Sequence, residues 1–219
     1  RDVLGSRGLG DVYKRQEIVP IMLSHGGRTF REYYDITPAE CCRLLEESDE
    51  IPSTAMATPA VFLESYNRAF ERGCTHLIGV IINGSGSGTY QAACLAKGMF
   101  EEEHGEGAMV IEVFDSRTYT YIYGHIVVKA AEMREQGESF EAITSVIRSR
   151  LSRVEAYLGV YTLKYLKKSG RISGGAAFVG EALGEVFVEL GIACGGNLVQ
   201  RHARRAVVCD VVVHYSETI

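Results

Sequence analysis

The residues around position 84 constrain the fold of this chain more than any other part of the sequence. An apolar run at residues 77–82 is followed by a loop of glycines and hydroxyl residues, 83–88, and then by a helix-forming segment that includes Ala92 and Ala93. A short apolar run of this kind is typical of a strand buried in a parallel sheet. The sequence therefore predicts a strand–loop–helix unit, with the glycine-rich loop at the carboxyl end of the strand.

The same loop has the chemistry of an anion-binding site. Backbone N–H groups at a helix start and the hydroxyl of Ser87 can donate hydrogen bonds to an anion, and glycines let a ligand approach the backbone. Ligands of open α/β sheets bind at this edge. The spacing matches neither a Walker loop nor the dinucleotide fingerprint, and the loop contains no lysine or arginine. A carboxylate therefore fits at least as well as a phosphate, and a plain turn capped by Ser87 or Thr89 is the simpler alternative.

The composition is that of a globular protein and excludes several function classes. With 219 residues, 46% of them hydrophobic, the chain has room for one large or two small domains. The formal net charge of −5 argues against nucleic acid as a partner, and no apolar run is long enough to span a bilayer. The six cysteines form no C-x-x-C pair, which predicts reduced, buried thiols in a cytoplasmic protein. No cofactor and no metal site are predicted.

Signals for strands and helices alternate along most of the chain. Strands are predicted at residues 18–23, 77–82, 110–114 and 157–161, and helices at residues 37–47, after Pro59, after Tyr90, and at 121–135, 140–154, 162–168 and 176–183. Thr37, Pro38 and Glu40 have the pattern of a capping box with proline at the first helical position. The alternation predicts an α/β fold whose sheet is mostly parallel and flanked by helices.

The signals also suggest how the chain is divided. Residues 1–16 show no strand or helix period and are interpreted as a non-native leader. Residues 17–156 are predicted to form an N-terminal α/β domain, and residues 157–219 part of a second, smaller α/β domain. Turns are poorly specified in 184–219, so this second domain is predicted to be incomplete or damaged.

Several segments, taken in order, resemble the DegV family of bacterial fatty-acid-binding proteins. They are Ile18-Val19-Pro20-Ile21, Tyr34-Asp35-Ile36-Thr37, Pro52-Ser53-Thr54, Ser87-Gly88-Thr89-Tyr90-Gln91, Asp115-Ser116, and the run from Thr162 to Ser173 that contains Lys167-Lys168-Ser169-Gly170-Arg171. The resemblance implies a two-domain α/β clamp that buries a long-chain fatty acid in a slot between its domains. It further implies a carrier, not an enzyme, that presents the carboxylate of the fatty acid to a partner fatty-acid kinase.

On this resemblance, the ligand-binding residues are expected in three segments. Ser87 and Thr54 would hold the carboxylate, helped by Ser53 and by the backbone N–H groups of Gly88 and Thr89. Arg171 would lie near the carboxylate mouth, although a solvated helix end would also explain a basic residue there. The residues also leave open an α/β enzyme that acts on a small phosphorylated or carboxylated metabolite.

The chain departs from the family pattern in three places. The family's first strand, with its Asp-Ser-Thr segment, is absent; Asn83 and Gly84 stand where a pair of hydroxyl residues is usual; and residues 184–219 do not follow the pattern, which favours a frameshift. The candidate residues for lining an acyl slot are all apolar or aromatic, and ordinary core packing is the favoured role of each. These candidates are Phe62, Ile82, Tyr119, Tyr121, Ile122, Phe178 and Leu183.

Overall fold

The computed structural model describes residues 16–32, 34–48, 50, 52–119, 121–154, 158–159, 187–188 and 210–215. Its strands are β1 (Gln16–Val19), β2 (Met22–His25), β3 (Arg28–Arg31), β4 (Ser53–Ala55), β5 (His76–Ile81), β6 (Val110–Asp115), β7 (Leu158–Gly159), β8 (Phe187–Val188) and β9 (Asp210–Tyr215). Its helices are α2 (Pro38–Glu47), α3 (Pro59–Glu71), α4 (Thr89–His104), α5 (Tyr121–Glu135) and α6 (Phe140–Leu151). The α/β fold predicted from the sequence is confirmed, whereas the helices predicted at 162–168 and 176–183 lie outside the described residues.

The chain forms two compact units and enters each of them more than once. Unit 1 holds the described residues of Arg1–Ile21, Met56–Val154 and Val208–Ile219, and unit 2 holds those of Met22–Ala55 and Glu155–Val207. Met22–Ala55, which was expected in an N-terminal domain of residues 17–156, thus groups with unit 2, because β2, β3 and β4 pair with one another. Similarly, β9 was expected in a C-terminal domain of residues 157–219 but pairs with β1 and β5 of unit 1.

The sheet of unit 1 has the strand order β1-β9-β5-β6. β5 and β6 are parallel, and Ile81 at the end of β5 lies opposite Asp115 at the end of β6. β9 is antiparallel to both of its neighbours, β1 and β5. Consequently β1, β5 and β6 run in the same direction and only β9 runs against them. The carboxyl ends of β5 and β6 therefore meet at one edge, where ligands bind in sheets of this kind.

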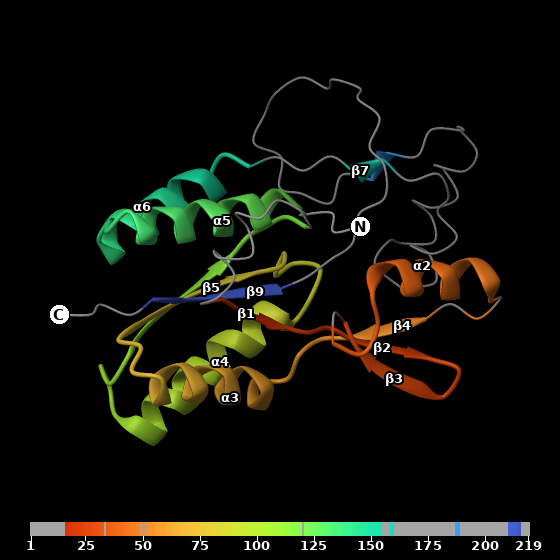
Figure 1. Ribbon diagram of the computed structural model, residues 1–219, viewed down its shortest axis with the longest axis horizontal. Helices are drawn as coiled ribbons and strands as arrows, with labels where there is room; N and C mark the ends of the chain where they lie inside the picture. Colours follow the sequence, from red (N-terminus) through yellow and green to blue (C-terminus); the bar gives the residue numbers. More distant parts are fainter. Residues whose placement is uncertain are drawn as a thin grey trace. The chain divides into compact units, whose positions relative to one another are not determined.

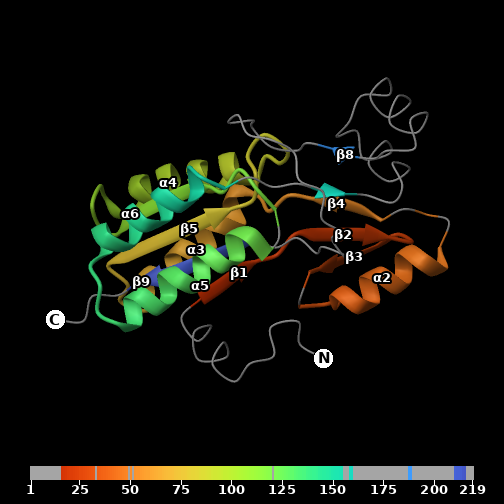
Figure 2. The same cartoon turned by 90° about the horizontal axis from the view of Figure 1, so that it is seen from above.

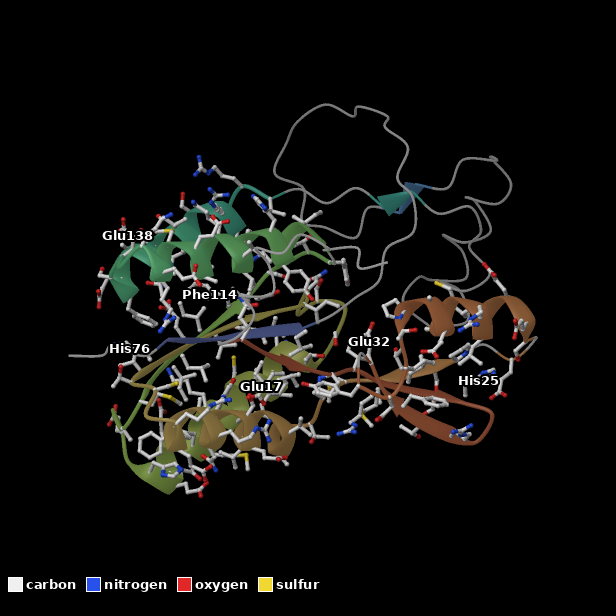
Figure 3. The ribbon with its side chains drawn as sticks, in the orientation of Figure 1. Glu17, His25, Glu32, His76, Phe114 and Glu138 are labelled. Atoms are coloured by element: carbon white, nitrogen blue, oxygen red, sulfur yellow. The ribbon has the colours of Figure 1, made fainter. Side chains whose placement is uncertain are left out.

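Helices cover both faces of this sheet. α3 and α4 lie on one face, and α5 and α6 lie on the other (Figure 1). On the first side, Glu17 of β1 forms ion pairs with Arg68 and Arg72 of α3; on the second side, Phe114 of β6 packs with residues of α5 and α6 (Figure 3). Each side has its own buried apolar cluster. The fully buried members include Phe62, Tyr66, Leu77 and Phe100 in the first cluster, and Val80, Tyr123, Ile143 and Ile147 in the second.

Unit 2 contains a small antiparallel sheet of order β3-β2-β4, with α2 beside it (Figure 2). The single strand predicted at residues 18–23 is wrong, because β1 ends at Val19 and β2 begins at Met22 in a different sheet. Pro20 accounts for the break, since proline has no N–H to continue a ladder. The turn between β2 and β3 consists of Gly26 and Gly27, with φ of 56° and 72°. Two consecutive positive φ values are typical of one of the two turn types favoured in two-residue hairpins, and glycine adopts them without strain.

The helix starts follow local sequence signals. In α2 the predicted capping box is confirmed: the hydroxyl of Thr37 accepts from the N–H of Glu40, and the carboxylate of Glu40 accepts from the N–H of Thr37. α3 begins with Pro59 after Thr58, as predicted, but the side chain of Thr58 makes no capping hydrogen bond. α6 is capped by Ser139, whose hydroxyl accepts from the N–H of Ala142 at 3.2 Å.

Two properties of the described part of the chain bear on the compositional predictions. None of its helices has both the length and the apolar character needed to cross a membrane. Cys41, Cys42, Cys74 and Cys94 are all free thiols. Cys94 is exposed and the other three are half-buried, so the expectation of buried cysteines is wrong at all four positions. At Cys94 the reason is that α4 turns its buried face, which includes Ala93 and Ala96, toward the core and leaves Cys94 outside.

The pKa of Asp35 provides a prediction for unit 2. The Asp35 carboxylate accepts hydrogen bonds from the side chain and from the backbone N–H of Arg31, which lowers its pKa from 3.8 to about 2. A lowered pKa means that the interaction stabilises the fold above the unfolded-state pKa, and that this contribution is lost as the pH falls toward 2. We expect Arg31→Gln to return the Asp35 pKa toward 3.8 in an NMR titration of the carboxyl carbon. Arg28→Gln in the same hairpin is the control and should leave that pKa unchanged.

Candidate anion-binding loop

Two loops meet at the carboxyl edge of β5 and β6. The β5–α4 loop (82–88) follows β5, and the β6–α5 loop (116–120, described to residue 119) follows β6. Backbone hydrogen bonds join them: the N–H of Ser116 donates to the carbonyl of Ile81 at 2.9 Å, and the N–H of Asn83 donates to the carbonyl of Thr118 at 3.1 Å. The strand–loop–helix unit predicted from the sequence is confirmed, and its loop is held by the neighbouring loop.

Asn83 is the residue around which the β5–α4 loop folds. It is 5% exposed, and its backbone carbonyl accepts from the N–H groups of both Gly86 and Ser87 at 3.1 Å. Its side-chain Oδ1 accepts from the N–H of Ser85 at 3.1 Å and from the Ser85 hydroxyl at 2.9 Å. Its Nδ2 donates to the hydroxyl of Tyr119 at 3.1 Å. These bonds set the course of the backbone from residue 83 to residue 87.

Asp115 ties the ends of the two strands together. Its Oδ1 accepts from the backbone N–H of Gly84 and from the backbone N–H of Arg117, both at 2.9 Å. Arg117 has a φ of 54°, which is uncommon for a residue with a side chain. Asp115 thus caps a turn, a role that Asp often has.

The three glycines of the loop lie against side chains of the protein itself. A Cβ atom at Gly84 would lie 2.9 Å from Oδ2 of Asp115, and one at Gly88 would lie 2.6 Å from Sδ of Met56. At Gly86 a Cβ atom would collide with the hydroxyl of Tyr119. The need for glycine at 84, 86 and 88 is therefore explained in part by packing within unit 1, in addition to any approach of a ligand.

Ser87 and Thr89 form a pair of hydroxyl groups at the start of α4. Their oxygens are 2.7 Å apart, and the Ser87 Oγ also accepts from the Thr89 N–H at 3.4 Å. Thr89 is fully buried, Ser87 is half-buried and Gly88 is exposed. If the buried Thr89 hydroxyl donates to Ser87, the Ser87 O–H remains available for a ligand. The N–H of Gly88 has no acceptor among the residues that the structure describes, as is usual at a helix start.

The other predicted site residues do not belong to the β5–α4 loop. Ser53 and Thr54 are exposed residues of β4 in unit 2, where they pair with Ser24 and Leu23 of β2. This short strand is not among those predicted from the sequence. Arg171 lies outside the described residues. The structure thus brings Ser87, Gly88 and Thr89 together in unit 1 and keeps Ser53 beside Thr54 in unit 2.

Of the candidate residues for lining an acyl slot, some lie in unit 1 and others lie outside the described residues. Phe62 and Ile82 belong to the buried cluster beneath α3 and α4, which agrees with the favoured role in core packing. Tyr119 packs against the edge of that cluster, and its hydroxyl reaches the β5–α4 loop. Phe178 and Leu183 lie outside the described residues. The contact between Tyr119 and the β5–α4 loop was not predicted from the sequence. The one sequence feature that could have indicated it is Asn83, which stands where the family usually has a hydroxyl residue.

Tyr90, in the first turn of α4, has a raised pKa. The largest cause is a hydrogen bond between its side chain and Cys94, and burial adds to it. The phenol therefore stays neutral over the physiological pH range.

Within the ranges the structure describes, no three His, Cys, Asp or Glu side chains are grouped in a way that could hold a metal ion.

Comparison with known proteins identifies relatives of this chain. A family model with the description "Uncharacterised protein, DegV family" matches residues 13–186. A DegV domain-containing protein of Clostridium acetobutylicum is 32% identical over 168 residues, which are 77% of this chain and 58% of that relative. This chain therefore spans less than two thirds of the length of such relatives.

Solved structures show the same fold. A DegV family protein from Thermus thermophilus, whose structure is described as showing fatty acid binding, is 30% identical, with a TM-score of 0.61 over 74% of this chain and 55% of that one. A stearic acid-binding protein from Eubacterium ventriosum is 27% identical, with a TM-score of 0.61 over 73% of this chain and 55% of that one.

Proposed function

Because this chain belongs to the DegV family, we propose that it binds a long-chain fatty acid and presents the carboxylate to a fatty-acid kinase. The observation that carries the proposal is the β5–α4 loop, where the Gly88 N–H has no acceptor among the described residues and the Ser87 O–H is left for an anion when the Thr89 hydroxyl donates to Ser87. Two structural relatives above 25% identity are described as fatty-acid-binding proteins, which supports the choice of ligand. In this proposal the protein is a carrier and catalyses no reaction on the lipid itself.

The proposed head-group site uses neutral donors. Ser87 and Thr54 hold the carboxylate, and the N–H of Gly88 and the hydroxyl of Ser53 assist them. The N–H of Thr89 also assists when it exchanges its bond to the Ser87 oxygen, 3.4 Å long, for one to the ligand. Donors at a helix start suit a single negative charge, because the partial positive charge of the first turn adds to the hydrogen bonds. The acyl chain lies in a buried slot between the two domains, where removal of its apolar surface from water supplies about 25 cal/mol per Å².

Arg171 has a separate role in this proposal. It follows Gly170 and lies close in sequence to Lys167 and Lys168, a pattern that fits the mouth of the slot better than its interior. A guanidinium there can form paired hydrogen bonds with a carboxylate or with a phosphoryl group during transfer by the kinase. The support for this role is the family resemblance of the segment 162–173.

The head-group site can be tested by removing one hydroxyl. Ser87→Ala should weaken fatty-acid binding by about 1.5–3 kcal/mol, the range for a hydrogen bond to a charged group, which corresponds to roughly a tenfold to hundredfold rise in Kd. The measurement is isothermal titration with palmitate. Ser85→Ala is the matched control, because the Ser85 hydroxyl lies in the same loop but already donates to Asn83. Equal affinities of the Ser87→Ala variant and the unsubstituted chain would contradict the assignment of Ser87.

The ligand class is tested more directly by native mass spectrometry of the protein purified from cells. A carrier should retain fatty acid through purification, and mild acid or organic solvent should release it. A small phosphorylated metabolite bound in place of lipid would support the alternative of an α/β enzyme and would overturn the proposal.

A further inference from the structure

The hydrogen bonds of Asn83 determine which way its amide faces. The N–H of Ser85 can only donate, so the atom of the Asn83 side chain that it contacts must be the oxygen. The amide nitrogen therefore faces Tyr119 and donates to the phenol oxygen at 3.1 Å. Because an amide nitrogen accepts no hydrogen bond, the hydroxyl proton of Tyr119 cannot be used in this contact.

That proton is left for another acceptor. In the described part of the chain, no group accepts a hydrogen bond from the Tyr119 O–H. The phenol oxygen lies directly over Gly86, where a Cβ atom would collide with it. Gly86 immediately precedes Ser87, and consecutive Cα atoms are only about 3.8 Å apart. The unused donor of Tyr119 thus lies against Gly86, the residue that precedes Ser87, whose hydroxyl is proposed to hold the carboxylate.

Thr118, the neighbour of Tyr119 in the β6–α5 loop, has a second hydrogen-bonding group without a partner among the described residues. Its side chain is fully buried, and its hydroxyl has no partner among the described residues. Buried polar groups are nearly always hydrogen-bonded, so an unpaired one needs an explanation. The carbonyl of Thr118 accepts the Asn83 N–H, which links this residue to the β5–α4 loop as well.

We propose that Tyr119 is a head-group residue, whose O–H donates a hydrogen bond to the anion held at the β5–α4 loop while its oxygen accepts from Asn83. This assignment rests on the proposed fatty-acid binding and extends the head-group site to the β6–α5 loop. Asn83 is then a positioning residue: it orients both Tyr119 and the backbone that leads to Ser87. In this chain Asn83 stands where the family usually has a hydroxyl residue, and the phenol of Tyr119 in the adjacent loop supplies a donor in its place.

The experiment compares Tyr119→Phe with the unsubstituted chain, using palmitate labelled with 13C at its carboxyl carbon and, separately, methyl palmitate. The variant should bind palmitate about tenfold more weakly and methyl palmitate equally well, because only the acid carries the negative charge. A donor to the ionised carboxyl also lowers its pKa. The bound carboxyl should therefore titrate about one unit higher in the variant, since one unit corresponds to a tenfold change.

Tyr90→Phe is the matched control. The Tyr90 side chain is already hydrogen-bonded to Cys94, so its removal should change neither palmitate affinity nor the carboxyl titration. Unchanged palmitate binding in Tyr119→Phe would overturn the assignment, as would equal losses for palmitate and its methyl ester, which would indicate a loosened loop. If the unsubstituted chain binds neither compound, the proposed function itself fails, and the assignment of Tyr119 fails with it.

Discussion

Phe100→Ala is expected to lower the free energy of unfolding by about 3–5 kcal/mol, the usual cost of emptying an aromatic site in a packed core. Phe100 lies on α4, is completely buried, and meets the ring of Phe70 edge-on with centroids 5.5 Å apart. It also contacts the His104 ring at a centroid distance of 4.6 Å. Removal of the side chain would leave a cavity between α3 and α4, which other residues could fill only in part.

The neighbouring Met99 offers the matched control for this prediction. It lies on the same helix and is 40% exposed, so Met99→Ala should change the free energy of unfolding by about 0.5 kcal/mol or less. Both variants are compared by urea unfolding followed by circular dichroism. If the two substitutions cost the same, α3 and α4 are not packed through Phe100 as described.

Asn83→Ala is expected to reduce both stability and ligand binding. The substitution leaves the N–H of Ser85 and the hydroxyl of Tyr119 without their partner in a part-buried loop. Two or three lost hydrogen bonds of about 1 kcal/mol each predict a loss of about 2–3 kcal/mol in the free energy of unfolding. Because the Asn83 side chain orients the phenol of Tyr119 and holds Ser85, two residues before Ser87, palmitate should bind at least tenfold more weakly even where the variant is fully folded.

Asn67→Ala on α3 controls for the loss of an asparagine. Among the described residues the Asn67 amide bonds only to the exposed side chains of Glu103 and His104, so its removal should have a small effect on unfolding and none on palmitate binding. Binding is measured at a temperature where circular dichroism shows every variant to be folded. An Asn83→Ala variant that binds palmitate normally would show that the loop keeps its conformation without this side chain.

Local signals were sufficient for much of unit 1 and for the helix starts. The apolar run before the glycine-rich loop predicted β5, and the loop was placed correctly between β5 and α4. The capping box at Thr37 and Glu40 was also predicted, because its partners are three residues apart and its hydrogen bonds form within one turn. Each of these features depends on residues that are close together in the sequence.

Strand pairing was predicted less well. Met22–His25 forms a second strand in a different sheet, and the short strand at Ser53–Ala55 was not predicted. β9 lies between β1 and β5, although its residues are more than 120 positions from β5. A strand's own residues indicate that it is extended, but its partner depends on contacts that may be formed by any strand in the chain.

The candidate site, too, was predicted from the sequence only in part. Residue types alone led to the prediction of an anion-binding loop at Ser87, Gly88 and Thr89, because glycines and hydroxyls at a helix start have that chemistry wherever they occur. The contacts of Asn83 with Tyr119 and of Gly84 with Asp115 join residues that are 36 and 31 positions apart. They exist only because β5 and β6 are parallel neighbours whose carboxyl ends meet at one edge. The orientation of the Asn83 amide, and with it the donor left on Tyr119, is therefore a property of the folded sheet and not of either segment.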